Sequence, residues 1–175
     1  MLSSKKRILI LFLLSAALSL CSCKRAHSPA VFGYVSCDAS FSLEFPSPTD
    51  AVVCRAEREG GSLTLSVTSP ERSADLRVIC SPDGCVIIPC GSESAIPLSS
   101  RASDGLTSVF SLLYRGSDGS ESVTRSDDGQ STVITYPDGA VTVGADMMPS
   151  SVELFSDHGK RRIAISGYNV TLPAE

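Results

Sequence analysis

The chain has 175 residues, enough for one domain and a short tether. Its formal net charge is -4, and it becomes -7 once the three cations Lys5, Lys6 and Arg7 are set aside with the first 22 residues. An acidic body argues against nucleic acid as a partner, because neutralising phosphates requires a basic surface. Trp is absent, aromatic residues are few, and Ser, Thr and Asp-Gly pairs recur, which is typical of a turn-rich β protein.

Residues 1–22 have the pattern of a secretory signal peptide. Three basic residues precede an apolar or small stretch of 13 residues, 8–20. This stretch is too short to cross a hydrocarbon core of ~30 Å, which needs about 20 residues of helix. We therefore expect export from the cytoplasm, with a short uncleaved membrane anchor as the alternative.

The sequence "LCSC", residues 20–23, resembles the lipobox of bacterial lipoproteins. The resemblance implies cleavage before Cys23, a diacylglyceryl group on its sulfur, and often a further acyl chain such as palmitate on the new amino group. The competing frame uses Cys21 and places the bulky Leu20 before the cut. Each buried acyl CH₂ contributes about 0.8 kcal/mol, so two or three chains hold a protein durably at a bilayer. We expect residues 23–37 to form a lipidated tether on the extracytoplasmic face of the cell membrane.

From Phe41 onward the apolar residues mostly alternate, with turn residues between the runs. Residues 52–69 are the clearest case, because Gly60-Gly61 suits a two-residue hairpin turn. The predicted cross-strand pairs are Arg58–Leu63, Ala56–Leu65 and Cys54–Val67. The apolar members of these pairs share one face, as a half-buried antiparallel sheet requires.

Residues 76–90 predict a second hairpin. Pro82-Asp83-Gly84 suits a type I turn closed by a glycine bulge, which pairs Ser81 with Cys85. The further predicted pairs are Cys80–Val86, Val78–Ile88 and Leu76–Cys90. In this register Cys80 and Cys85 lie on opposite faces, which forbids a disulfide between them unless the register changes.

One amphipathic helix is predicted between residues 103 and 115. Its apolar stripe, at i, i+3, i+4 and i+7, consists of Leu106, Val109, Phe110 and Leu113. Ser103 suits the N-cap, and Gly116 suits the position just after the helix.

Strand patterns resume after the helix, giving about nine or ten strands and one domain over residues 38–175. A helix of about 12 residues is near 18 Å long and cannot cover the apolar face of so wide a flat sheet. We therefore predict a mainly β fold: a curved antiparallel sheet, or half-barrel, with the helix in its concave face. A two-sheet sandwich with a peripheral helix is the alternative.

Residues 40–168 resemble the LolA-like lipoprotein-sorting family, in particular its short lipoprotein members from Gram-positive bacteria. The likeness lies in "TSPE" at residues 68–71, in "VITYPDGAVTVGA", and in the last hairpin, which begins at Pro149. It implies a half-barrel with a helical lid and an apolar groove for acyl chains. The candidate groove residues are Leu63, Leu65, Val67, Val78 and Ile88 on the sheet and Leu106, Val109, Phe110 and Leu113 on the helix. The family's soluble carriers are not anchored, whereas this chain would be tethered through Cys23.

Five cysteines follow Cys23: Cys37, Cys54, Cys80, Cys85 and Cys90. Buried thiols are the favoured interpretation, with one disulfide as the alternative. A metal site is not expected, because no Cys-x2-Cys unit or neighbouring histidine is present. His27 and His158 are expected to be solvated, in the tether and in a turn.

The sequence contains no nucleophile elbow, phosphate-binding glycine loop or His-Glu-x-x-His motif. We therefore expect a non-enzymatic lipoprotein without a cofactor that binds a lipid or an acylated protein in its groove. The alternative is a cell-envelope module that binds a partner protein, supporting a cell-wall or sporulation protein.

Overall fold

The structure is a computed structural model of the chain and describes residues 29–157 and 159–171. The predicted signal peptide and Cys23 lie outside these residues. Within the described part of the chain, no helix has the length and apolar character that a membrane span requires. In chain order the elements are η1 (Pro29–Ser36), β1 (Asp38–Phe45), β2 (Val52–Glu59), β3 (Ser62–Ser69), η2 (Glu71–Ser73), β4 (Arg77–Ser81), β5 (Gly84–Ile88), β6 (Ile96–Pro97), α2 (Ser100–Tyr114), β7 (Ser122–Arg125), β8 (Ser131–Tyr136), β9 (Gly139–Gly144), β10 (Pro149–Ser156) and β11 (Gly159–Thr171).

The described strands form one antiparallel sheet of eleven, in the order β6-β5-β4-β3-β2-β1-β11-β10-β9-β8-β7. Strands β1–β6 and β7–β11 are two meanders, and the pairing of β1 with β11 joins them at the centre of the sheet. The mainly β fold class is therefore confirmed, and the two-sheet alternative is wrong. The strand number exceeds the expected nine or ten partly because β6 has only two residues.

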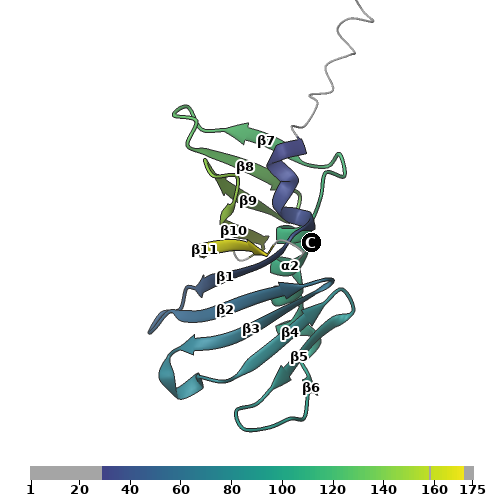
Figure 1. Cartoon of the computed structure of the whole chain (residues 1–175), viewed down its shortest axis with the longest axis vertical. Coiled ribbons are helices and arrows are strands. Elements are labelled where there is room, and N and C mark those ends of the chain that lie inside the picture. Colours follow the sequence, from purple (N-terminus) through teal and green to yellow (C-terminus); the bar gives the residue numbers. More distant parts are fainter. Residues whose placement is uncertain (1–28, 158, 172–175) are drawn as a thin grey trace, which may run out of the picture.

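Helix α2 connects the two edge strands, because it follows β6 and precedes β7 in the chain. Its main contacts are with β4 and β5 in one half of the sheet and with β9 and β10 in the other. In Figure 1 α2 lies behind the middle of the curved sheet, where its two halves meet. This arrangement is the predicted half-barrel with a helix in its concave face.

A second covering element, η1, comes from the segment that the sequence assigned to the tether. It contacts α2, and its side chains Val31 and Tyr34 are 3% and 2% exposed. Figure 1 shows η1 beside α2, over the second half of the sheet. The packed part of the domain therefore begins before residue 38, with residues 29–36 inside it.

The hairpin of β2 and β3 has the predicted register. Arg58 pairs with Leu63, Ala56 with Leu65 and Cys54 with Val67. Gly60 takes a φ of 55°, the left-handed conformation for which glycine suits this turn. The alternation of apolar and polar residues fixes this register, because a slip of one residue would turn every apolar side chain outward.

The predicted register of β4 and β5 is wrong by one residue. Ser81 pairs with Gly84, and Cys80 lies directly opposite Cys85 across a two-residue turn, Pro82-Asp83. Val78 consequently pairs with Ile87, and Ile88 turns to the opposite face. Residues 85–88 are an unbroken apolar run, so either register brings apolar side chains to the core and periodicity cannot choose between them.

Helix α2 begins at Ser100, three residues before the predicted start. Ser103 is not its N-cap: Ser103 lies inside the helix, and its backbone N–H donates to the carbonyl of Ser99 at 2.9 Å. Gly116 does not adopt the left-handed conformation that was expected after the helix, because Arg115 ends it in an extended conformation. The predicted apolar stripe is nevertheless correct, and Leu112 widens it.

Gly139 of β9 lies at a close approach of α2 to the sheet. A Cβ atom at this position would overlap Leu112 of the helix and would lie 2.5 Å from the carbonyl oxygen of Glu153. The neighbouring backbone cannot yield as a flexible side chain would, so only glycine fits here.

We expect Gly139→Ala to lower the free energy of unfolding by about 1–3 kcal/mol, the usual cost of overpacking. Urea unfolding measures this change. Gly116→Ala is the control, because nothing lies within 4 Å of its Cβ position. Equal free energies of unfolding for the two variants would contradict the close approach of α2 to β9 at Gly139.

Candidate functional site

The structure brings the predicted groove residues together as a packed core. Leu63, Leu65, Val67 and Val78 on the sheet face Val109, Phe110 and Leu113 on the helix, and all are less than 9% exposed. Leu106 packs partly buried against the same cluster. The prediction that Ile88 lines the groove is wrong. Ile88 lies on the outer face of β5, and Ile87 takes its place on the inner face.

A pocket of about 320 Å³ opens along one side of α2. Its lining is mainly apolar and consists of Pro82, Thr107, Phe110, Ser111, Tyr114 and Arg115. Only Phe110 belongs to the predicted groove. The sequence carried a signal for three of the others, because Thr107, Ser111 and Tyr114 form with Phe110 a second stripe, at i, i+3, i+4 and i+7, beside the buried one. It carried none for Pro82 and Arg115.

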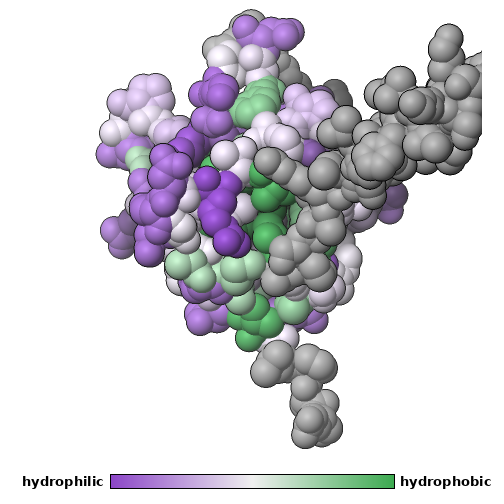
Figure 2. Space-filling model, turned by 90° about the horizontal axis from the view of Figure 1, so that it is seen from above, coloured by the Kyte–Doolittle hydropathy of each residue, from purple (hydrophilic) through white to green (hydrophobic). Residues whose placement is uncertain are grey.

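Apolar surface is also visible on the outside of the molecule. Figure 2, seen from above, shows a green patch in the middle of this face with hydrophilic surface along one side of it.

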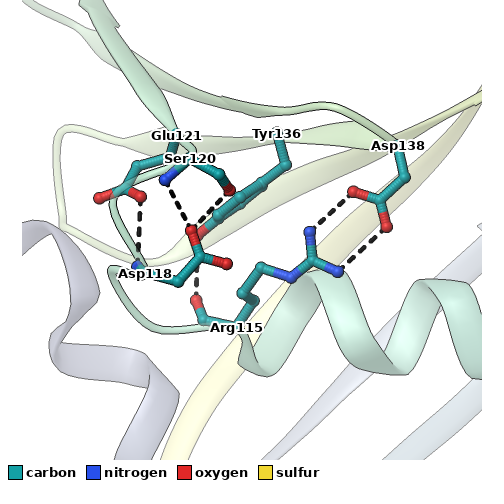
Figure 3. A network of polar contacts seen from close by, with 6 residues as sticks. All are labelled: Arg115, Asp118, Ser120, Glu121, Tyr136 and Asp138. Atoms are coloured by element: carbon teal, nitrogen blue, oxygen red, sulfur yellow. Dashed lines mark hydrogen bonds and ion pairs between the residues drawn. The ribbon is translucent and has the colours of Figure 1, made fainter.

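Arg115 fixes the C-terminal end of α2 to the sheet. Its guanidinium donates two parallel hydrogen bonds to the carboxylate of Asp138, at 2.7 and 3.1 Å. The Tyr136 hydroxyl donates to the carbonyl of Arg115 at 3.0 Å (Figure 3). Burial raises the pKa of Tyr136 to about 12, so this hydroxyl keeps the proton that it donates.

The connector that follows the helix is held by two carboxylates. Glu121, only 8% exposed, accepts hydrogen bonds from the Ser117 hydroxyl and from the backbone N–H of Asp118 and Gly119. Asp118 accepts from the backbone and hydroxyl of Ser120, and these bonds lower the pKa of its carboxyl (Figure 3). The path from α2 to β7 is therefore well defined.

The N-terminal half of α2 is held more weakly. Its N-cap, Ser99, makes no side-chain capping bond, and the first turn contains no acidic residue. Gly105 lies inside the helix, where glycine costs about 1 kcal/mol relative to alanine. Ser108 returns a hydrogen bond to the carbonyl of Asp104, a pattern that slightly destabilises helices. This half depends on its packing against the β4–β5 hairpin.

Arg58 ties η1, the sheet and α2 together. Its Nη1 atom donates to the carbonyls of Val35 and Cys37 at 2.5 and 2.7 Å, and its guanidinium lies 3.8 Å from the centre of the Tyr114 ring. A charged residue near the end of β2 thus stabilises the packing of η1 and α2 against the sheet. The sequence did not indicate this role, because an arginine at a hairpin end is usually a solvated residue.

No metal-binding cluster of three or more His, Cys, Asp or Glu residues occurs in the described ranges, 29–157 and 159–171. The carboxylates around α2, Asp118, Glu121 and Asp138, hold the helix and its connector in place. A ligand in the pocket would therefore meet a mainly apolar surface that also carries hydroxyl groups and one guanidinium group.

No family model matches the chain, and no curated protein matches its sequence. Several solved structures follow a similar course of the chain, among them the following two. An uncharacterised conserved protein from Thermus thermophilus has 8% identity and a TM-score of 0.49, over 82% of this chain and 84% of that one. A LolA superfamily protein from Nitrosomonas europaea has 12% identity and a TM-score of 0.39, over 81% of this chain and 89% of that one. At these values neither likeness carries a family or functional assignment.

We expect Arg58→Ala to lower the free energy of unfolding by about 2–4 kcal/mol, because two charged hydrogen bonds and a cation–π contact are lost together. Urea unfolding measures the loss, and limited proteolysis before residue 38 reports the release of η1.

Arg55→Ala is the matched control in the same strand. The side chains of Arg55 and its partner Glu57 are 65% and 49% exposed, so this change is expected to stay within about 0.5 kcal/mol. Similar losses in the two variants would contradict the role given to Arg58.

Proposed function

We propose that this protein is a non-enzymatic lipoprotein, anchored to the extracytoplasmic face of the cell membrane through Cys23, that binds a lipid or an acylated ligand between α2 and the concave face of the sheet. The observation that carries this proposal is the pocket beside α2, which residues of the helix and its C-cap line together with Pro82 of the β4–β5 turn.

The dimensions and chemistry of this pocket suit one end of an amphipathic molecule. Its volume of about 320 Å³ lies at the lower end of the range of small-molecule sites, about 300–1,000 Å³. Phe110 and Tyr114 offer ring surfaces to an acyl chain. Arg115, which keeps a quarter of its side chain exposed despite its bond to Asp138, offers a guanidinium edge to a polar head.

The unequal attachment of α2 supports a role as a lid. Its C-terminal end is fixed by Arg115, Asp138 and Tyr136, whereas its N-terminal half relies on packing against β4 and β5. When the N-terminal half lifts, Leu106 leaves the core and Thr107 leaves Cys85, so that the pocket becomes continuous with the inner face of the sheet. The packed groove of the structure is, in this proposal, the closed state.

A second candidate function is partner binding in the cell envelope. Ile79 and Val86 form an apolar pair on the outer face of β4 and β5, and Ile88 continues it. All three are half-buried and lie beside the short edge strand β6, whose exposed Pro97 pairs with Val86 on the same face. Such a patch suits a protein partner. Its binding would survive changes that fill the pocket.

For the ligand site, we expect Ser111→Phe to fill the pocket and to weaken binding of a fluorescent fatty-acid probe by about tenfold, or about 1.4 kcal/mol. Titration of the full chain in detergent measures this, and native mass spectrometry reports co-purified lipid.

Ser108→Phe is the matched control, because it makes the same change on the same helix at a residue that does not line the pocket. Absence of any bound lipid or probe in the unaltered protein, or equal weakening by both variants, would remove the lipid-binding proposal.

For the anchor, we expect Cys23→Ala to abolish incorporation of radiolabelled palmitate and to release the protein from the membrane fraction, because the acylated sulfur is lost. Cys21→Ala keeps the preferred cleavage frame and is expected to remain labelled. Labelling that depends on Cys21 instead would show that the other frame is used.

A further inference from the structure

We infer that Cys80 and Cys85 form an intrachain disulfide when the protein folds in the presence of a thiol–disulfide oxidant, and that this bond closes the β4–β5 hairpin beneath α2. The inference rests on the proposed function in one respect: the proposed location outside the cytoplasm is where the protein would meet such an oxidant.

The register of the hairpin brings the two residues together. Cys80 and Cys85 are directly opposite each other on antiparallel strands. Such pairs have Cα atoms about 4.5–5.5 Å apart, which is within the range of protein disulfides. Both side chains point to the inner face, and their Sγ atoms are 2.8 Å apart as thiols. A bridge therefore requires no movement of the backbone.

The other described cysteines have different neighbours. Cys37 Sγ donates to the carbonyl of Gly33, and Cys90 Sγ donates to the carbonyl of Ala74. Cys54 is buried on β2, which is separated from β4 by β3. Among the five described cysteines, Cys80 and Cys85 are thus the pair that the fold places in position for a bond.

The reaction balances as an exchange with a disulfide oxidant such as oxidised glutathione. A thiolate of the pair attacks the oxidant and releases one reduced thiol, and the second cysteine then attacks the mixed disulfide and releases the other. In total the pair loses two protons and two electrons, and the oxidant disulfide becomes two thiols.

Burial makes the timing of this reaction important. Cys80 and Cys85 are 0% and 5% exposed, and burial raises the pKa of Cys80 well above its usual range. The attacking thiolate is therefore scarce once α2 covers the hairpin. Bond formation belongs to the stage of folding before the helix docks, and the finished bond is shielded from reductants.

The disulfide would restrict the movement of residues that line the pocket. Pro82, one of its walls, lies in the turn between the two cysteines, and Cys85 Sγ lies 3.5 Å from the hydroxyl of Thr107, another wall. Oxidation would fix the turn that the N-terminal half of α2 packs against.

The experiment uses the full chain, unfolded and reduced in detergent and then refolded in a glutathione redox buffer. After denaturation, free thiols are alkylated, and peptide mapping is done before and after reduction. We expect Cys80 and Cys85 to be alkylated only after reduction, and Cys37, Cys54 and Cys90 to be alkylated before it. Oxidation is also expected to raise the midpoint of thermal unfolding by roughly 5 °C.

Two variants keep the result interpretable. Cys54→Ala is expected to leave the protection of the pair unchanged, and the double variant Cys80→Ala with Cys85→Ala is expected to lose the thermal shift. Alkylation of both residues without reduction, or a bridge between other cysteines, would overturn the inference. Probe binding measured on the same samples tests the proposed function separately, so failure of one is distinguishable from failure of the other.

Discussion

One chain connection governs this fold: α2 joins the two outermost strands of an open sheet. A flat sheet of eleven strands spaced about 4.8 Å apart would be roughly 48 Å wide, whereas the 15 residues of α2 extend about 22 Å. Curving the sheet around the helix shortens this distance and covers the inner apolar face at the same time. A pocket remains along one side of the helix, between α2 and Pro82 of the β4–β5 turn.

The two ends of α2 are held by different kinds of interaction. At the C-terminal end, directional polar contacts to Asp138 and Tyr136 fix the helix in place. At the N-terminal end, a weak helical sequence packs on the β4–β5 hairpin with one weak thiol–hydroxyl contact, between Cys85 and Thr107. Polar bonds of defined geometry specify a position, whereas apolar packing tolerates sliding and separation. This contrast makes the helix suited to open at one end while it stays attached at the other.

The sequence predicted those parts of the fold in which local pattern and burial agree. Strict alternation around Gly60-Gly61 led to the right register, and the helical stripe identified the inner face of α2. The apolar run 85–88 carries no alternation, and there the register failed and misplaced Ile88. The irregular segment 29–36 has no period that distinguishes it from a tether, so η1 was missed. Arg58 was missed because its role depends on Val35, Cys37 and Tyr114, which only the tertiary structure brings near it.

The pairing of β1 with β11 places the first and last described strands at the middle of the sheet, with Asp38 opposite Thr171. The centre of the molecule therefore cannot form until synthesis has passed β11. Long-range pairings of this kind form slowly, since a large loop must close before any contact compensates for it. An incomplete chain therefore lacks the partner of β1, and the two meanders stay unjoined until the last strand has been made.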